Sequence, residues 1–268
     1  MTKLVICDID ATLVNEKKEL TPRTKKNLIQ LHEKGIYFGI ASGRPADELK
    51  RNKEYWDLPF DFDFVVGMNG AELWDGVHQK FYSYFMMKKE WLKETMEIMK
   101  VVKCNPMIYW NGKIRCVHID DWMIHSASTS HKELEIVKLE DFYAHENAKI
   151  MFRMKEEDMP KAEAWVKEHP NPYYHGFKTQ STLLEFCDKR INKGYGLKKI
   201  CELNDLDIKD VMAFGDTSND NDMLKVAGCG VCMINGTDDT KACANAITKQ
   251  DNDHDGLAIY LEESGILC

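Results

Sequence analysis

The chain has 268 residues, of which 44% are hydrophobic and 30% charged, and its formal net charge at pH 7 is -8. This composition is typical of a globular protein, and the length allows one large domain or two modest ones. The excess of negative charge argues against a nucleic-acid or anionic-membrane partner, and no apolar run approaches the roughly 20 residues that cross a bilayer. The 9 cysteines are scattered along the chain, so we expect reduced thiols and a cytoplasmic location.

The first part of the chain alternates expected strands with expected helices. Apolar runs at Lys3 to Cys7, Ile36 to Ala41 and Phe62 to Val66 predict three strands. Between the first two, Thr21-Pro22 starts a helix that ends before Gly35, because threonine caps a helix and proline fits its first turn. Crossover helices of this kind join parallel strands. The pattern therefore predicts an α/β fold, with a Rossmann-like parallel sheet and helices on both of its faces.

The pattern changes near residue 80 and resumes near residue 190. The intervening section is richer in aromatic residues; Met107 to His118 predicts a hairpin that turns at Asn111-Gly112, and Glu156 to Glu168 predicts an amphipathic helix. After it come an expected strand at Val211 to Phe214, a helix at Asp220 to Val226 and a strand at Gly230 to Met233. We therefore expect residues 1–80 and 190–268 to form one core domain, and residues 81–189 to form an inserted α+β domain.

Polar side chains follow the expected strands, at the edge where ligands bind in open α/β sheets. In chain order they are Asp8 and Asp10, then Ser42, then Asn69, and after the insert Asp216 and Asp220. If Asp216 joins Asp8 and Asp10, each pair of carboxylates 4 Å apart costs on the order of 4 kcal/mol. A bound cation offsets that repulsion, and oxygen ligands suit Mg²⁺.

This arrangement favours phosphoryl transfer. A carboxylate beside a hard cation can attack phosphorus and form an aspartyl-phosphate. A second carboxylate two residues further on can protonate the leaving oxygen and then deprotonate water. Ser42, backbone amides and Lys193 are suited to bind the phosphoryl oxygens.

Four segments resemble the motifs of the haloacid dehalogenase superfamily, in order and in spacing. They are DIDATL at Asp8 to Leu13, ASGR at Ala41 to Arg44, NKGYGL at Asn192 to Leu197, and GDTSND at Gly215 to Asp220. The insert between the second and third motifs is similar to the cap of the Cof-type, subclass IIB phosphatases. Asn69-Gly70-Ala71 and Met233 to Gly236 also resemble that branch.

The resemblance implies a role for each motif residue. Asp8 would be the nucleophile and a metal ligand, and Asp10 the general acid and base, with its backbone carbonyl on Mg²⁺. Asp216 would complete the metal site, and Thr12 and Asp220 would support it without binding the metal. The residues that would bind phosphate are Ser42, Gly43, Lys193, Asn69 and Asn219.

The same resemblance implies a Mg²⁺-dependent phosphatase that acts on small phosphorylated metabolites, with sugar phosphates as the expected class. Residues 81–189 would be a cap that excludes water and selects the leaving group. A phosphomutase, which returns the phosphoryl group to a sugar, is the alternative within enzymes. Outside enzymes, the alternatives are a Ca²⁺-binding protein and a phospho-accepting signalling module. The sequence does not indicate the oligomeric state.

Ala11 and Ile234 depart from the family pattern, because glycine is usual at both positions. If Ala11 has a negative φ, alanine fits and stiffens the loop. If its φ is positive, the cost falls on the loop that holds Asp10. We expect a functional site because both aspartates and Thr12 remain; a positive φ together with a displaced Asp10 would count against it.

Two further patterns have competing interpretations. Asp251 to Glu262, DNDHDGLAIYLE, matches a Ca²⁺-binding loop, but it is a single loop, and acids before a terminal helix also cap that helix. Cys229 to Cys232 has redox or zinc spacing, but it lies in an apolar run without a second pair, which favours a core strand.

Overall fold

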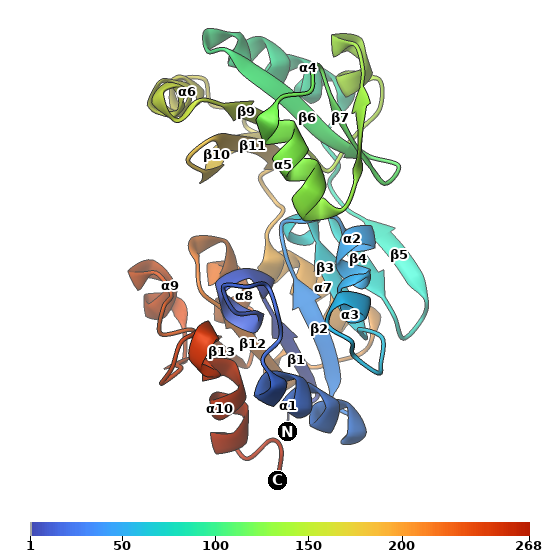
Figure 1. The fold of residues 1–268 in the computed structure, drawn as a ribbon, viewed down its shortest axis with the longest axis vertical. Coiled ribbons are helices and arrows are strands. Elements are labelled where there is room, and N and C mark those ends of the chain that lie inside the picture. Colours follow the sequence, from blue (N-terminus) through green and yellow to red (C-terminus); the bar gives the residue numbers. More distant parts are fainter. Residues whose placement is uncertain (1) are drawn as a thin grey trace. The chain divides into compact units, whose positions relative to one another are not determined.

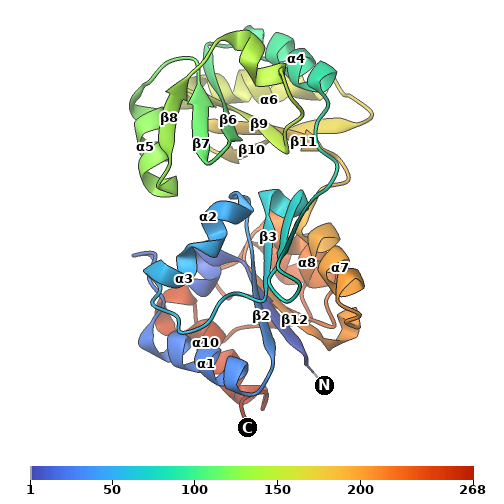
Figure 2. The same cartoon turned by 90° about the vertical axis from the view of Figure 1, so that its right-hand side faces the viewer.

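Two units make up the part of the chain that the computed structural model describes, residues 2–268 (Figures 1 and 2). The core unit comprises the chain up to Tyr82 together with Asn192–Cys268. The inserted unit is Ser83–Ile191. Each unit has its own sheet and its own hydrophobic clusters.

The core unit is built on a sheet of eight strands within the described residues. Their spatial order is β14 (Ala246–Ile247), β13 (Cys229–Cys232), β12 (Val211–Gly215), β1 (Leu4–Cys7), β2 (Tyr37–Ala41), β3 (Phe64–Gly67), β4 (Glu72–Asp75) and β5 (Lys80–Ser83). Strands β14 to β3 in this order run parallel, and β4 is antiparallel to β3. The central strands are apolar along their whole length because helices cover both faces.

Helices cover the two faces of this sheet. On one face lie α1 (Pro22–Glu33) and α10 (Gly256–Glu263), and on the other lie α7 (Lys193–Leu203) and α8 (Asn221–Val226) (Figure 2). Thr21 caps α1, its hydroxyl accepting from the Thr24 amide at 3.2 Å. The predicted fold class is confirmed. The remaining helices of the unit are α2 (Ala46–Lys50), α3 (Asn52–Tyr55) and α9 (Asp238–Cys243).

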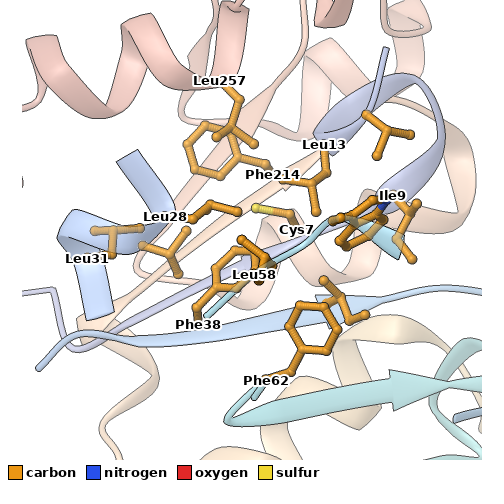
Figure 3. Close-up of a cluster of buried hydrophobic side chains, with 14 of the residues drawn as sticks. Cys7, Ile9, Leu13, Leu28, Leu31, Phe38, Leu58, Phe62, Phe214 and Leu257 are labelled. Carbon is orange, nitrogen blue, oxygen red and sulfur yellow. The ribbon is translucent and has the colours of Figure 1, made fainter. Parts of the chain in front are cut away.

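The main hydrophobic cluster lies between the sheet and the α1/α10 layer. Leu28 and Leu31 of α1 and Leu257 of α10 pack there against Phe38 and Phe214 of the sheet (Figure 3). Side chains of a strand alternate between its faces, so one strand contributes to both layers. Strands β1 and β12 are paired in parallel within this sheet, so their carboxyl ends lie side by side at one edge.

The inserted unit contains a second sheet, of six strands within the described residues. Their order is β10 (Tyr174–Gln180), β11 (Leu183–Asp188), β9 (Lys149–Met154), β6 (Cys104–Trp110), β7 (Lys113–Cys116) and β8 (Glu133–Ile136). Neighbours are antiparallel except β7 and β8, which are parallel. The predicted hairpin is confirmed: β6 and β7 turn at Asn111 and Gly112, whose φ values are 48° and 75°.

The longer helices of the inserted unit are α4 (Lys89–Ile98), α5 (Asp121–Ser130) and α6 (Met159–Glu168). Short helical turns complete the structure: η1 (Ile9–Leu13), η2 (Met68–Gly70), η3 (Met99–Val101), η4 (Leu139–Tyr143), η5 (Glu156–Asp158), η6 (Ile208–Asp210), η7 (Ser218–Asp220) and η8 (Asn252–His254). Among the helices of residues 2–268, none combines the length and the apolar character needed to span a bilayer.

Candidate active site

Three buried carboxylates meet at the carboxyl edge of the core sheet. Asp8 directly follows β1 and Asp216 directly follows β12, and these strands are neighbours, with Cys7 opposite Phe214. The Asp8 amide extends the ladder by donating to the Phe214 carbonyl at 2.9 Å. One carboxylate oxygen from each of Asp8, Asp216 and Asp220 lies within 4.8 Å of the others. Asp8 and Asp216 thus lie together, as the sequence predicts. The Asp10 carboxylate is not part of this group.

Lys193 links two of these acids. It is the first residue of α7, whose N-terminus is capped by the Asn192 side chain accepting from the Tyr195 amide at 2.7 Å. Its Nζ donates to Asp8 Oδ1 and to Asp220 Oδ1, both at 2.5 Å, and the residue is fully buried. Burial alone would lower the pKa of this ammonium, but the two carboxylates raise it above its ordinary value. The lysine is therefore charged.

Asp220 organises the loop after β12. Its Oδ2 accepts from the backbone amides of Asp216 and Thr217 at 3.0 and 3.2 Å, while its Oδ1 accepts from Lys193. Gly215 is needed here, because a Cβ at this position would lie 2.5 Å from the Asp220 Cβ. Both oxygens of Asp220 are engaged, which makes it a support for Lys193 and Asp216 rather than an available metal ligand.

Burial and mutual repulsion perturb the two remaining acids. Burial raises the pKa of Asp8 well above its ordinary value; Lys193 opposes this rise, and Asp220 and Asp216 add to it. Burial likewise raises the pKa of Asp216 to about 6, against a hydrogen bond from the Thr12 hydroxyl, which donates to Oδ1 at 2.7 Å. Carboxylates held this way favour either a proton or a cation.

The residues present fit a divalent metal ion. When all three carboxylates are ionised, the one ammonium leaves two negative charges in a buried volume, which a bound cation can offset. The Oδ2 atoms of Asp8 and Asp216 accept no hydrogen bond from residues 2–268, whereas their Oδ1 atoms are both engaged. Hard oxygen ligands of this kind suit Mg²⁺, which takes one or two carboxylates and keeps several waters.

The Asp10 carboxylate has its own pair of cations. Lys18 Nζ donates to it at 2.7 Å, and Arg44 donates to its two oxygens at 3.3 and 3.0 Å. Burial tends to raise the pKa of Asp10, but these two cations outweigh burial and lower the pKa below its ordinary value. Neither cation was predicted to belong to the site. Arg44 lies inside the second motif, and this position could have indicated that it belongs to the site. Lys18 has no such signal, because its sequence context is that of any solvent-exposed lysine in a turn.

Ala11 has a positive φ of 58°, with ψ at 10°. The condition under which alanine would fit this turn without strain is therefore not met. The Asn235 side chain donates to the Ala11 carbonyl at 2.9 Å, which ties the turn to the segment after β13. The strain falls on the loop that carries Asp10, whose carboxylate is held by Lys18 and Arg44.

Ser42, Gly43 and Asn69 lie together at the ends of β2 and β3. The Asn69 amide donates to the Ser42 carbonyl at 3.0 Å, and a Cβ at Gly43 would lie 3.4 Å from Asn69 Oδ1. Met68 and Asn69 have φ values of 49° and 55°, and the Asn69 Oδ1 is buried with no partner in residues 2–268. Backbone strain and orphaned polar atoms of this kind are concentrated at functional sites.

This second group adjoins the N-terminus of α7. Gly70 has a φ of 108°, and a Cβ on it would lie 2.4 Å from the Asn192 carbonyl oxygen. The loop after β3 thus approaches the residue that precedes Lys193. Asn219, by contrast, is exposed in η7, and no hydrogen bond within the described residues joins its side chain to Asp8 or Lys193.

The acids of the Ca²⁺-like segment have protein partners. Asp253 accepts from the Glu16 amide at 2.8 Å, Asp255 from the Thr21 hydroxyl at 2.5 Å, and Glu262 from Arg23 at 3.0 and 2.5 Å. In residues 2–268, the only acid, histidine or cysteine group with metal-site geometry is Asp8, Asp216 and Asp220. Residues 251–262 therefore tie the C-terminal segment to the loop after η1 and to the first turn of α1. Cys229 and Cys232 are free thiols within β13.

The described fold and site define a class of protein. It is an α/β protein with a carboxylate and lysine centre at the carboxyl edge of a parallel sheet and with an α+β unit inserted after β5. Sequence comparison then identifies the family, because the profile of the haloacid dehalogenase-like hydrolases matches residues 5–261. The chain belongs to this family, and the predicted resemblance is confirmed.

Three known proteins illustrate the similarity. The 5-amino-6-(5-phospho-D-ribitylamino)uracil phosphatase YitU of Bacillus subtilis is 25% identical, over 97% of this chain and 96% of its own length. A haloacid dehalogenase-like hydrolase from Bacteroides thetaiotaomicron has a TM-score of 0.87 at 25% identity, covering 98% of this chain and 100% of its own. The subclass IIB sugar phosphatase BT4131 has a TM-score of 0.83 at 22% identity, covering 99% of this chain and 100% of its own. The family and these relatives agree with the predicted enzyme class, a phosphatase.

Proposed function

We propose that this protein is a Mg²⁺-dependent phosphatase that hydrolyses small phosphorylated metabolites, with sugar phosphates as the expected class. The observation that supports the proposal most is the buried centre in which Lys193 joins Asp8 to Asp220 beside Asp216. Membership of the hydrolase family supports a hydrolysis reaction. The relatives that are named as phosphatases support phosphate esters as the substrates.

The nucleophile in this proposal is Asp8. A carboxylate oxygen of Asp8 forms a bond to phosphorus, and the bond between phosphorus and the ester oxygen breaks. Lys193 holds Asp8 Oδ1 at 2.5 Å and thereby orients the side chain and offsets the negative charge that the substrate brings. Mg²⁺ bound by Asp8, Asp216 and the Asp10 carbonyl would supply further charge neutralisation of the phosphoryl oxygens.

Asp10 is proposed as the general acid and base. It gives a proton to the departing oxygen in the first step. In the second step it accepts a proton from water, which attacks phosphorus and releases phosphate and the free Asp8 carboxylate. Arg44 and Lys18 hold the Asp10 carboxylate where the structure has it. These cations lower the pKa of Asp10, so the acid step requires that Asp10 take up a proton once the substrate's phosphate draws Arg44 and Lys18 away from its carboxylate.

The phosphoryl oxygens would be bound by the second group and by Lys193. Ser42 is buried at the end of β2, and the Gly43 amide and the Asn69 side chain lie beside it. Asn219 is also proposed to contact phosphate, from η7, where its side chain is exposed. The inserted unit, Ser83–Ile191, is proposed as the cap that selects the leaving group and excludes water.

We also propose a cytoplasmic location. The 9 cysteines are free thiols, as expected in a reducing compartment. The substrate partner is a small phosphate ester, and the net charge of -8 argues against nucleic acid.

A phosphomutase is the alternative, because it uses the same nucleophile and returns the phosphoryl group to a sugar. Product analysis separates the two: a phosphatase releases inorganic phosphate, and a mutase yields an isomerised sugar phosphate. The Ca²⁺-binding alternative is not favoured, since the carboxylates of Asp253, Asp255 and Glu262 accept hydrogen bonds from protein groups. A signalling module would need neither the insert nor Asp10.

The test is phosphate release from a panel of sugar phosphates and an aryl phosphate, with Mg²⁺ and with a chelator. We expect release only with the metal, and loss of release in Asp8→Asn. Asp253→Asn is the matched control, because it removes a carboxylate that bonds the Glu16 amide instead. Activity that survives Asp8→Asn would exclude the covalent mechanism, and activity that survives chelation would exclude the metal.

A further inference from the structure

A pocket of about 430 Å³ lies within the inserted unit. It is lined by Lys88, Trp91, Pro172, Tyr173, Lys189 and Arg190. All six belong to Ser83–Ile191, and none belongs to the proposed catalytic centre. Small-molecule sites commonly have volumes of roughly 300–1,000 Å³, so the pocket has room for a ligand of metabolite size.

One wall of the pocket is a pair of stacked aromatic rings. The Trp91 and Tyr173 rings are 5.2 Å apart between centroids and inclined by only 10°. Tyr173 is nevertheless 59% exposed, which is unusual for a large aromatic side chain held in a stack. The Lys189 amide donates to the Tyr173 carbonyl at 2.9 Å, so the backbones that carry the ring and the lysine lie side by side. The pair offers a flat surface on which a further planar ring can stack.

The other walls carry positive charge. Arg190 is paired with Asp188, at 2.9 and 2.7 Å, and so this acid does not neutralise the lysines. Lys88 and Lys189 are exposed and make no ion pair within residues 2–268, and Lys88 Nζ lies 5.3 Å from the Trp91 ring centroid. Lys88 is also the residue before α4, a helix of 10 residues whose N-terminus has no side-chain cap. The dipole of α4 adds positive potential at this N-terminus, which Glu90 in the first turn of the helix partly offsets.

The pocket also lies where the chain enters and leaves the inserted unit. Lys88 follows the first connection, at Ser83, and Arg190 precedes the second, at Ile191. The Arg190 guanidinium lies 3.7 Å from the ring centroid of Phe85, so the two connections contact one another. A molecule in the pocket would contact Arg190, beside the second connection, and Lys88, which follows the first.

We propose that this pocket binds a planar aromatic phosphate ester, of the kind represented by a nucleoside monophosphate, at a site separate from Asp8. The ring stacks on Tyr173, and the phosphate is bound by Lys88 and Lys189. A ring without a phosphate leaves the lysines unpaired, and a phosphate without a ring leaves the stack uncovered, so neither part alone binds as well.

Calorimetric titration of the full chain with adenosine monophosphate, in the presence of a chelator, tests the proposal. We expect saturable binding to one site, weakened about tenfold or more in Lys88→Ala/Lys189→Ala and in Tyr173→Leu. Lys161→Ala is the matched control, an exposed lysine of α6 outside the pocket, and it should bind as the unmodified chain does. Adenosine and inorganic phosphate should each bind at least about tenfold more weakly than the ester.

Two results would overturn the proposal: no saturable binding, or binding that the lysine double variant retains. The substituted side chains are exposed, so the variants should fold, which their melting temperatures will verify. The measurement needs neither metal nor turnover. Its failure is therefore distinct from failure of the proposed phosphatase activity.

Discussion

Replacing Ala11 by glycine should stabilise the protein, which is the reverse of the usual effect of that change. Ala11 has φ 58° and ψ 10°, where a Cβ costs about 1–2 kcal/mol. Glycine removes this cost but gives the unfolded chain more freedom, which offsets about 0.4–1 kcal/mol of the gain. The difference is about 0–1.6 kcal/mol, so we expect the free energy of unfolding to rise by about 0.8 kcal/mol, and the melting temperature by about 2 °C.

The assay is calorimetric unfolding of Ala11→Gly beside Ala244→Gly. Ala244 is also half-buried and follows a helix, but its φ is -87° and its ψ 154°. Its change to glycine should lower the free energy of unfolding by about 0.4–1 kcal/mol. Opposite signs for the two variants support the reasoning. If Ala11→Gly is destabilised as much as Ala244→Gly, the turn at position 11 is not strained and the reasoning is refuted.

Three further predictions concern the carboxylates. Asp10→Asn should lower kcat for alkyl phosphates by about 10²–10⁴-fold and less for an aryl phosphate, whose leaving group needs no proton; equal losses would contradict its role as acid. The pKa of Asp216 is raised from 3.8 to about 6. As the pH rises, Asp216 therefore loses its proton at a higher pH in the folded state than in the unfolded state. As the pH rises from about 4 to 7, the metal-free protein should lose about 3 kcal/mol of stability relative to Asp216→Asn, and Mg²⁺ should restore that stability. If urea unfolding shows a stability difference between the two proteins that does not change with pH, this prediction is wrong. Gly215→Ala should cost about 1–3 kcal/mol and also lower kcat, because its Cβ would lie 2.5 Å from the Cβ of Asp220; an unaltered urea midpoint would argue against that close approach.

The central group of the site could be predicted because it depends on strand order. Asp8 and Asp216 directly follow apolar strands, and the carboxyl ends of parallel strands share one edge. Lys193 could be placed there only through its motif, since a lone lysine is ordinarily exposed. Its burial follows from the two carboxylates that it bonds, which are 185 and 27 residues away in the sequence.

Other features depend on contacts that no local pattern reveals. The positive φ of Ala11 belongs to the turn η1, which follows β1. The Ala11 carbonyl in this turn accepts a hydrogen bond from the Asn235 side chain. Lys18 is 62% exposed, and only its reach to Asp10 distinguishes it from other surface lysines. Glu262 completes a Ca²⁺-loop pattern, yet it bonds Arg23 across 239 residues of sequence. The sequence motifs thus identified the acids and the lysine of the site. The residues that position them, such as Lys18 and Asn235, could be found only in the folded structure.

The identity of the phosphorylated residue is the most direct test of the proposed mechanism. The protein is mixed with Mg²⁺ and an aryl phosphate, quenched within one turnover and reduced with borohydride, which converts an acyl phosphate of aspartate to homoserine. Peptide sequencing should find homoserine at position 8 alone, and none in a sample without substrate. Homoserine at another aspartate, or rapid phosphate release with no reducible intermediate, would contradict nucleophilic attack by Asp8.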